Sequence, residues 1–117
     1  MDLQIIKKIT EQPTIHIGKT GTLRMNKKVA QMIGLEKNQT WAVAHDKDEH
    51  PASKHMYLLT HKDGSHIEGG FKFTFQNGSW FHDIKIATFE LRLNVPMSLN
   101  FELFEFQNFR GIKIILH

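Results

Sequence analysis

Five of the eight histidines in this chain fall within one polar stretch, and imidazole is the commonest metal ligand in proteins. They are His45, His50, His55, His61 and His66, and three acidic residues, Asp46, Asp48 and Glu49, lie between the first two. A metal site needs ligands that converge on one point. A spacing of five places successive histidines on no common helical face and matches no zinc-ligand pattern. We therefore interpret the stretch as a solvated histidine-rich loop and expect no metal site.

Other catalytic apparatus is not visible in the sequence. The chain contains no Cys, which excludes disulfides, thiolate zinc sites and cysteine nucleophiles. It contains no Gly-x-Ser-x-Gly motif, P-loop or dinucleotide fingerprint. Gly18-Lys19-Thr20 is similar to the end of a P-loop, but residues 13–17 lack the loop's first glycine. We expect a protein that is not an enzyme, with no catalytic residues and no cofactor.

The elements that position the remaining polar residues begin with a predicted hairpin and helix. Residues 14–17 and 22–25 alternate like short strands around a Gly-containing turn. Asn26 suits a helix N-cap, and the apolar residues of Lys27–Ile33 fall on one helical face. Gly34 then suits a left-handed helix end. Beyond it we predict a strand at 40–44, a loop at 45–55, a strand at 56–60 and a polar connector at 61–70.

The second half begins with Phe71-Lys72-Phe73-Thr74-Phe75, whose alternation predicts a strand with three Phe on one face. Asn77 and Ser79 are candidate caps for a helix predicted over Trp80–Leu91, although Ile84-Lys85-Ile86 also suits a strand. Strands are predicted at 100–106 and 112–116, with a turn at 107–111. We assign Trp41, Tyr57, Trp80 and the Phe residues to the core, because they occupy predicted inward positions.

The two halves share one order of elements: a Gly-containing turn, a strand, an Asn-capped helix, a strand, a loop and a strand. With 117 residues, the chain has the size of one domain. We therefore predict an α+β fold, β-rich, in which residues 1–117 form a single domain from two β-α-β-β pseudo-repeats. The halves are placed at about residues 13–62 and 68–117, each burying its apolar face on the other.

The net charge of +3 is unevenly distributed. Residues 1–62 hold ten Lys or Arg and six Asp or Glu, whereas residues 63–117 hold five and six. Such asymmetry favours a polyanionic partner, and the alternative is a solvated surface that happens to be rich in Lys. No apolar stretch is long enough to cross a membrane, and the N-terminus lacks a signal-peptide core. We expect a cytoplasmic protein without a membrane partner.

Residues Gly21 to Val43 resemble the swapped-hairpin family of AbrB and MazE-type transcription factors. That family shows a Gly, an apolar strand, a short helix ending in Gly-Leu, a few polar residues and another strand. The match rests on six residues and extends over about residues 14–60: Gly21, Val29, Ile33, Gly34, Leu35 and Val43. The chain departs from the family at Met25-Asn26, where the family has Ile-Pro, and its loop 45–55 is longer than the family's hairpin.

This resemblance implies a swapped-hairpin-like barrel with two short helices that binds duplex DNA. The tandem halves would supply a pseudo-dimer within one monomer, and a homodimer is the alternative. The implied nucleic-acid-binding residues are Lys19, Arg24, Lys27 and Lys28. Lys27 and Lys28 fall in the predicted first helical turn, where backbone N–H groups favour an anion, and Arg24 could reach a phosphate or a base edge. The corresponding positions of the second half, Gly70, Phe75, Gly78 and Ser79, are not basic.

The whole chain also resembles an uncharacterised bacterial family with the same tandem β-α-β-β layout. The shared features are residues 15–21, an aromatic strand near Tyr57, the Gly-Gly-aromatic-x-Phe strand at 69–73 and the apolar terminal strand. Two function hypotheses follow. The first is a DNA-binding transcriptional regulator or antitoxin-like protein, and the second is a non-enzymatic protein-interaction or structural module that uses a protein partner.

Overall fold

The structure of the chain is a computed structural model that describes residues 1–5, 12–49 and 54–116. In these residues two short helices accompany eight antiparallel strands. The helices are α1 (Lys27–Ile33) and α2 (Lys85–Glu90). The strands are β1 (Ile15–Ile17), β2 (Thr22–Asn26), β3 (Ala42–Ala44), β4 (His55–His61), β5 (Thr74–Gln76), β6 (Ser79–Asp83), β7 (Met97–Phe106) and β8 (Phe109–Ile115). The prediction of a β-rich domain with two short helices is confirmed at this level.

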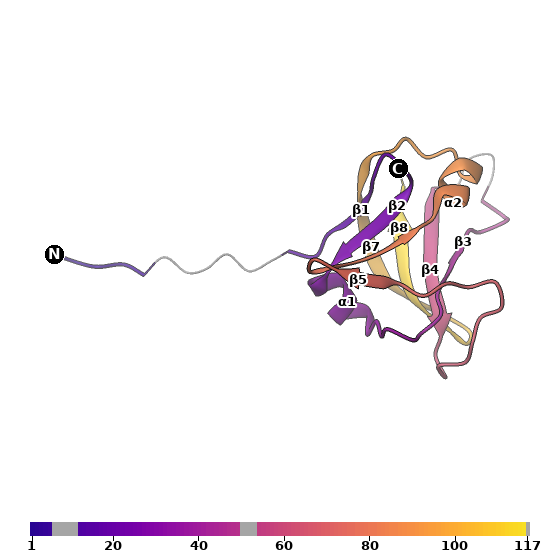
Figure 1. Cartoon of the computed structure of the whole chain (residues 1–117), viewed down its shortest axis with the longest axis horizontal. Helices are drawn as coiled ribbons and strands as arrows, with labels where there is room; N and C mark the ends of the chain where they lie inside the picture. Colours follow the sequence, from indigo (N-terminus) through magenta and orange to yellow (C-terminus); the bar gives the residue numbers. More distant parts are fainter. Residues whose placement is uncertain (6–11, 50–53, 117) are drawn as a thin grey trace.

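The eight strands form one sheet in the order β3-β4-β8-β7-β1-β2-β6-β5, and the sheet curls into a half-barrel (Figure 1). Four hairpins supply most of the pairing: β1–β2, β3–β4, β5–β6 and β7–β8. The two edge strands approach each other at one point, where Trp41 and Phe71 form an antiparallel bridge. Each residue donates its N–H to the other's carbonyl, at 2.7 and 2.8 Å.

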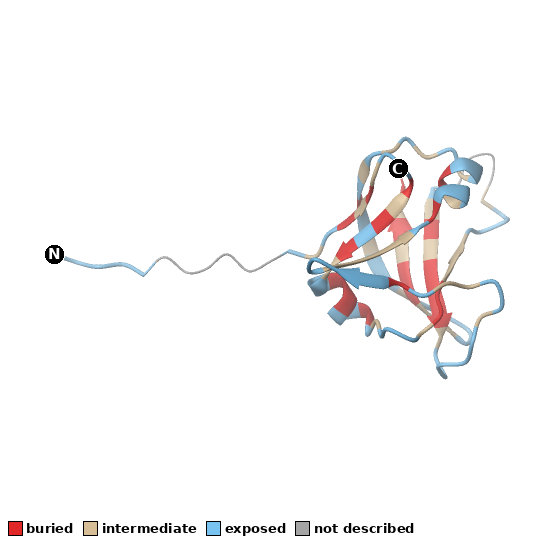
Figure 2. Cartoon of the chain, viewed as in Figure 1, coloured by how far each residue is buried: buried red, intermediate tan, exposed pale blue. Residues whose placement is uncertain are grey.

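The core lies on the concave side of the curled sheet, and its residues alternate with exposed ones along β1 and β2 (Figure 2). Ile15, Ile17, Leu23 and Met25 are buried there, whereas Arg24 is exposed on the outer face. Val29 and Ile33 bring the apolar face of α1 against them, and Trp41 is completely buried. This alternation is the period of two expected when one face of a strand is covered.

The local predictions for the first half are confirmed. The Asn26 side chain accepts a hydrogen bond from the Val29 N–H at 3.2 Å and so caps α1. Gly34 ends the helix with φ of 60°, in the left-handed region. The Leu35 N–H then donates to the Ala30 carbonyl at 2.9 Å.

The helix predicted over Trp80–Leu91 is wrong in its first part and confirmed in its second. Residues 79–83 form β6, and only Lys85–Glu90 is helical. Asn77 and Gly78 are the two turn residues of the β5–β6 hairpin, with φ of 52° and 79°. Asn-Gly is the strongest short hairpin signal, because both positions of this turn need positive φ. Asn77 and Ser79 therefore cap no helix, and α2 has no side-chain cap at Ile84.

The strand predicted over Phe71–Phe75 is also wrong in part. Phe71 takes part only in the bridge to Trp41, and regular pairing begins at Thr74. The three Phe rings do not share one environment: Phe73 is 3% exposed, Phe71 is half-buried and Phe75 is 45% exposed. The bridge pairs Phe71 with Trp41, whereas Thr74–Gln76 pair with β6, so the predicted strand is divided between two partners.

Smaller differences concern the order and the ends of elements. Each half of the chain runs β-β-α-β-β, with one more strand than the predicted β-α-β-β. The strand predicted at 40–44 is reduced to Ala42–Ala44, and the turn predicted at 107–111 ends before Phe109. In the predicted loop 45–55, residues 50–53 lie outside the described residues, and His55 already belongs to β4.

The prediction that the aromatic residues lie in the core is confirmed for some of them and wrong for others. Trp41 and Phe73 are core residues, but Phe89 and Phe106 are 85% and 56% exposed. Tyr57 lies half-buried against Phe104, with ring centroids 4.7 Å apart. In the part of the chain that the structure describes, no helix has the length and apolar character needed to span a bilayer.

Candidate nucleic-acid interface

Arg24 occupies the middle of β2, on the outer face of the sheet. It is paired with His16 on β1 and with Phe81 on β6. The Arg24 guanidinium carbon lies 4.7 Å from the centroid of the Phe81 ring, a cation–π contact that holds the side chain flat on its neighbour. His16, Arg24 and Phe81 thus form a row of neighbouring residues across three strands. On the β7 side of this row, the His16 Nδ1 atom lies 3.4 Å from the Ser98 hydroxyl. The row therefore presents one cation between an imidazole and an aromatic ring.

Lys27 and Lys28 are the first two residues of α1, and both are exposed. Lys27 does not point toward Arg24: its Nζ atom lies 5.8 Å from the centroid of Phe75, which is on the opposite face of the sheet from Arg24. The helix has seven residues, and the Asn26 oxygen already accepts the Val29 N–H. The expected anion site on free N–H groups at the helix start is therefore not supported.

Lys19 lies in the exposed turn between β1 and β2, at the other end of β2 from Lys27. Five strand residues separate the two positions, and they correspond to roughly 16 Å. The structure thus lines the four predicted residues along β2 and the start of α1. It does not bring them to one point, so any common ligand must be extended.

The charges of the sheet are segregated. One region, called the basic half here, consists of residues 12–33 and 69–83 and contains β1, β2, α1, β5 and β6. It carries one acidic residue, Asp83 at the end of β6, and five basic residues: Lys19, Arg24, Lys27, Lys28 and Lys72. The other region, the mixed half, consists of residues 41–62 and 97–116 with β3, β4, β7 and β8. It carries five basic and five acidic residues, so its charges cancel.

Polar clusters elsewhere are small. Among the described residues, no three His, Cys, Asp or Glu side chains come together in a way that could hold a metal ion. The His55 Nδ1 atom lies 2.8 Å from a carboxylate oxygen of Glu49. In the turn after β4, hydrogen bonds from Ser65 lower the pKa of the Asp63 carboxyl. Neither feature touches the basic half.

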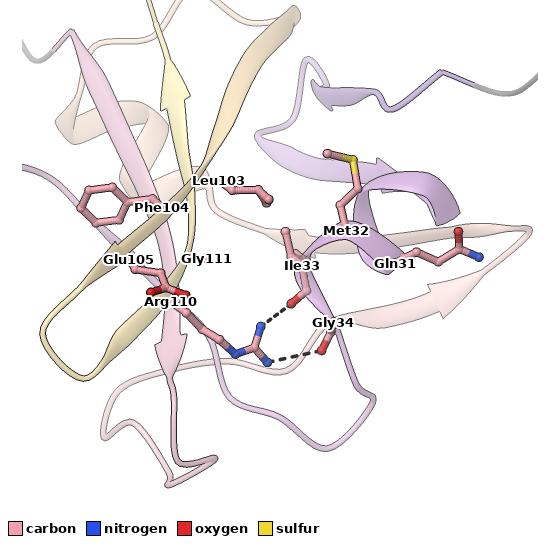
Figure 3. A pocket seen from close by; sticks show the side chains of 9 residues that line it. All are labelled: Gln31, Met32, Ile33, Gly34, Leu103, Phe104, Glu105, Arg110 and Gly111. Atoms are coloured by element: carbon pink, nitrogen blue, oxygen red, sulfur yellow. Dashed lines mark hydrogen bonds between the residues drawn. The ribbon is translucent and has the colours of Figure 1, made fainter.

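A groove of about 530 Å³ separates the end of α1 from β7 and β8 (Figure 3). Leu103 points from β7 toward the helix across this space (Figure 3). Arg110 on β8 donates hydrogen bonds to the Ile33 and Gly34 carbonyls, the latter at 3.4 Å, and its guanidinium lies 5.8 Å from the Trp41 ring. Arg110 therefore ties the last turn of α1 to the mixed half.

A second groove, of about 410 Å³, runs along the other side of α1, and we call it the α1 groove. Its lining residues are Lys27, Ala30, Gln31, Gly34, Leu35, Glu36, Phe75 and Trp80. The Phe75 and Trp80 ring centroids are 5.0 Å apart, at an interplanar angle of 49°. The groove is not evident from the sequence, in which Phe75 and Trp80 both fit core positions. The Asn-Gly turn at 77–78 was the one available signal, since it predicts that the two rings face each other across a hairpin.

Comparison of the chain with protein-family models, with curated proteins and with solved structures gave no match.

Proposed function

We propose that this chain is a nucleic-acid-binding protein, a DNA-binding transcriptional regulator or antitoxin-like protein, which contacts the phosphate backbone through its basic half. The observation that supports it best is the segregation of charge: five basic residues against one acidic residue in the basic half, and five against five in the mixed half. Phosphate contacts dominate the affinity of proteins for DNA, and they need many cations spread along a surface more than one preformed pocket. Lys19, Arg24 and Lys28, spread along β2 and the start of α1, have that character.

Arg24 has the central role in this proposal. Its contact with Phe81 keeps the guanidinium extended on the outer face, so little side-chain freedom is lost when it meets a phosphate or a base edge. His16 beside it is a second hydrogen-bonding group that could face the same backbone. An interface of this kind positions the nucleic acid, and the lysines supply most of the salt-dependent affinity.

The proposal includes the pseudo-repeat and the AbrB/MazE-type relationship, and the strand pairing supports both. Suppose that each strand is exchanged with its counterpart in the other half: β1 with β5, β2 with β6, β3 with β7 and β4 with β8. Every pair of neighbouring strands except one then becomes another pair of the same sheet. In that exchange the β7–β1 pair becomes the contact at Trp41 and Phe71. The middle residues of β2 and β6, Arg24 and Phe81, pair with each other, as an axis of approximate twofold symmetry between the two halves requires.

The approximate symmetry does not extend to chemistry. α1 begins with Lys27-Lys28, whereas α2 begins with Lys85-Ile86. We therefore propose that a monomer uses one basic face, at α1, and contacts nucleic acid asymmetrically. A symmetric homodimer would present two such faces.

Binding to a duplex DNA oligonucleotide tests this function. We expect binding that weakens steeply with salt, measured by fluorescence anisotropy from about 50 to 200 mM salt. Substituting Arg24, Lys27 and Lys28 together by Ala should lower the affinity at least about tenfold and reduce the salt slope by about 2 to 3. The matched control substitutes Lys47, Lys62 and Lys113 of the mixed half by Ala, which removes the same charge and should change the affinity little. Equal losses in the two triple variants, or no binding by the original chain at low salt, would overturn the proposal.

A protein-interaction module is the second candidate function, and the exposed apolar face of α2 favours it. Ile86 and Phe89 are 76% and 85% exposed, and their spacing of three residues places them on one side of the helix. Specific association with a protein, with no nucleic acid retained, would support this candidate. The two functions are compatible, since α1 and α2 belong to different halves of the chain.

A further inference from the structure

We propose that the α1 groove binds an unpaired nucleobase, which stacks on Phe75 and Trp80 while the adjoining phosphate contacts Lys27. This inference rests on the proposed nucleic-acid binding and deepens it, because it names single-stranded nucleic acid as a ligand of the α1 side of the basic half. The groove is distinct from the outer face that carries Arg24.

Phe75 is an exposed aromatic residue. It lies on β5 opposite Trp80, and its ring is 45% exposed although the two rings contact each other. Trp80 is half-buried and forms the floor of the pair. An exposed ring beside a second aromatic ring gives a flat base the stacking surface that proteins use for single strands.

The polar groups that line the groove change from basic to acidic along α1. Lys27 at the start of the helix lies over the Phe75 ring, and Gln31 lines the groove one turn later. Glu36 lies beyond the end of the helix, on the order of 10 Å or more from Lys27. A phosphate is attracted to the Lys27 end and repelled at the Glu36 end, so the ligand enters with a defined direction.

Two polar residues of the groove, Gln31 and Glu36, can form hydrogen bonds with the edge of a base. The Gln31 amide both donates and accepts hydrogen bonds, and the Glu36 carboxylate accepts them. With the base stacked on Phe75, an exocyclic amino group directed along α1 approaches the acceptors. Bases that carry such a group, cytosine, adenine and guanine, should therefore bind better than thymine.

The volume and the surroundings agree with this ligand. The groove measures about 410 Å³, within the range of small-ligand sites and large enough for one base with part of its sugar. The β5–β6 hairpin and α1 belong to the basic half, whose one acidic residue, Asp83, lies at the end of β6 away from the turn at 77–78. A single strand leaving the groove at Lys27 therefore continues over a surface that attracts its phosphates.

The test compares a single-stranded oligonucleotide with a duplex of the same length. Phe75→Ala should weaken binding of the single strand about tenfold, the size of one lost base–aromatic stack, and should leave the duplex affinity unchanged. Phe75→Leu keeps an apolar side chain but removes the stacking ring, so its loss should approach that of Phe75→Ala. The matched control is Phe106→Ala, which removes an equally exposed ring from β7 in the mixed half and should leave both affinities unchanged.

The outcomes separate this inference from the proposed function. If Phe75→Ala leaves the single-strand affinity intact while the Arg24, Lys27 and Lys28 triple variant loses duplex binding, the base site is wrong and the proposed function stands. If the original chain binds neither oligonucleotide at low salt, both fail. Circular dichroism of Phe75→Ala should match the original chain, and single-strand binding that is lost with Phe75→Ala but kept with Phe75→Leu would contradict stacking.

Discussion

The basic half and the mixed half of the sheet are built from the same kinds of element and differ in what their outer faces carry. The basic half has short strands, an Arg–Phe contact and five basic residues against one acidic residue. The mixed half has the longest strands, β7 with ten residues and β4 and β8 with seven each, and ion pairs such as Lys113–Glu102 at 3.9 Å. Long strands with balanced charge suit a stable frame, whereas unbalanced charge lowers stability slightly and suits an anionic ligand. In this comparison the mixed half supplies the longer paired strands, and the basic half carries the surface that we propose for binding.

The largest effect is expected at Gly111 on β8, which pairs with Leu59 of the neighbouring strand β4 in the mixed half. Gly111 has φ of 155°, and a Cβ atom there would overlap the backbone oxygen of Leu58. Gly111→Ala should therefore destabilise the fold by more than about 4 kcal/mol, or prevent folding. The measurement is urea unfolding followed by circular dichroism.

Gly78→Ala in the basic half is the control for Gly111. Gly78 has a similarly positive φ, of 79°, but open space around it, so Ala should cost only about 1 to 2 kcal/mol of backbone strain. A loss as large for Gly78→Ala as for Gly111→Ala would show that the mixed half is not the more tightly packed frame.

The second largest effect on stability is expected at Arg110 of β8, which donates hydrogen bonds to the Ile33 and Gly34 carbonyls at the end of α1 and so connects the two halves. Arg110→Met should lower the free energy of unfolding by about 2 to 3 kcal/mol, because charged hydrogen bonds to carbonyls that lack other partners are lost. Lys113→Met on the same strand is the control, and it should cost less than about 1 kcal/mol because its ion pair with Glu102 is long, at 3.9 Å, and Glu102 is exposed. Similar losses in both variants would mean that Arg110 does not couple the halves.

The smallest of these effects concerns Asn26, at the junction of β2 and α1 in the basic half. Its oxygen accepts N–H groups from Val29 and Thr14, and its amide donates to the Gln12 carbonyl. Asn26→Ala should cost about 1 to 2 kcal/mol, the upper range for a helix cap, measured by thermal or urea unfolding. Asn77→Gly is the contrasting variant: its φ of 52° suits Gly, so stability should change little. A marked loss of stability for Asn77→Gly would show that the Asn77 side chain contributes to the fold and would contradict its assignment as a turn residue only.

The sequence predicted the first half of the chain well because its signals are local. Asn26, Gly34 and the alternation over 14–25 each act through neighbours in the chain, by a cap, a left-handed end and the period of a strand. The second half was predicted less well, since Trp80 to Leu91 fits both a helical and an extended pattern. Pairing with β2 on one side and β5 on the other decided for a strand at 79–83.

The candidate site shows the same division. Amino-acid types and their order alone predicted which residues are basic and that Lys27 and Lys28 begin a helix. Only the tertiary structure decided that Arg24 and Lys27 lie toward opposite faces of the sheet, that residues 12–33 and 69–83 come together as one mainly basic region, and that Phe75 faces α1. The physical reason is that strand pairing between distant segments depends on the packing of the whole sheet, whereas caps, turns and side-chain alternation depend on a few adjacent residues.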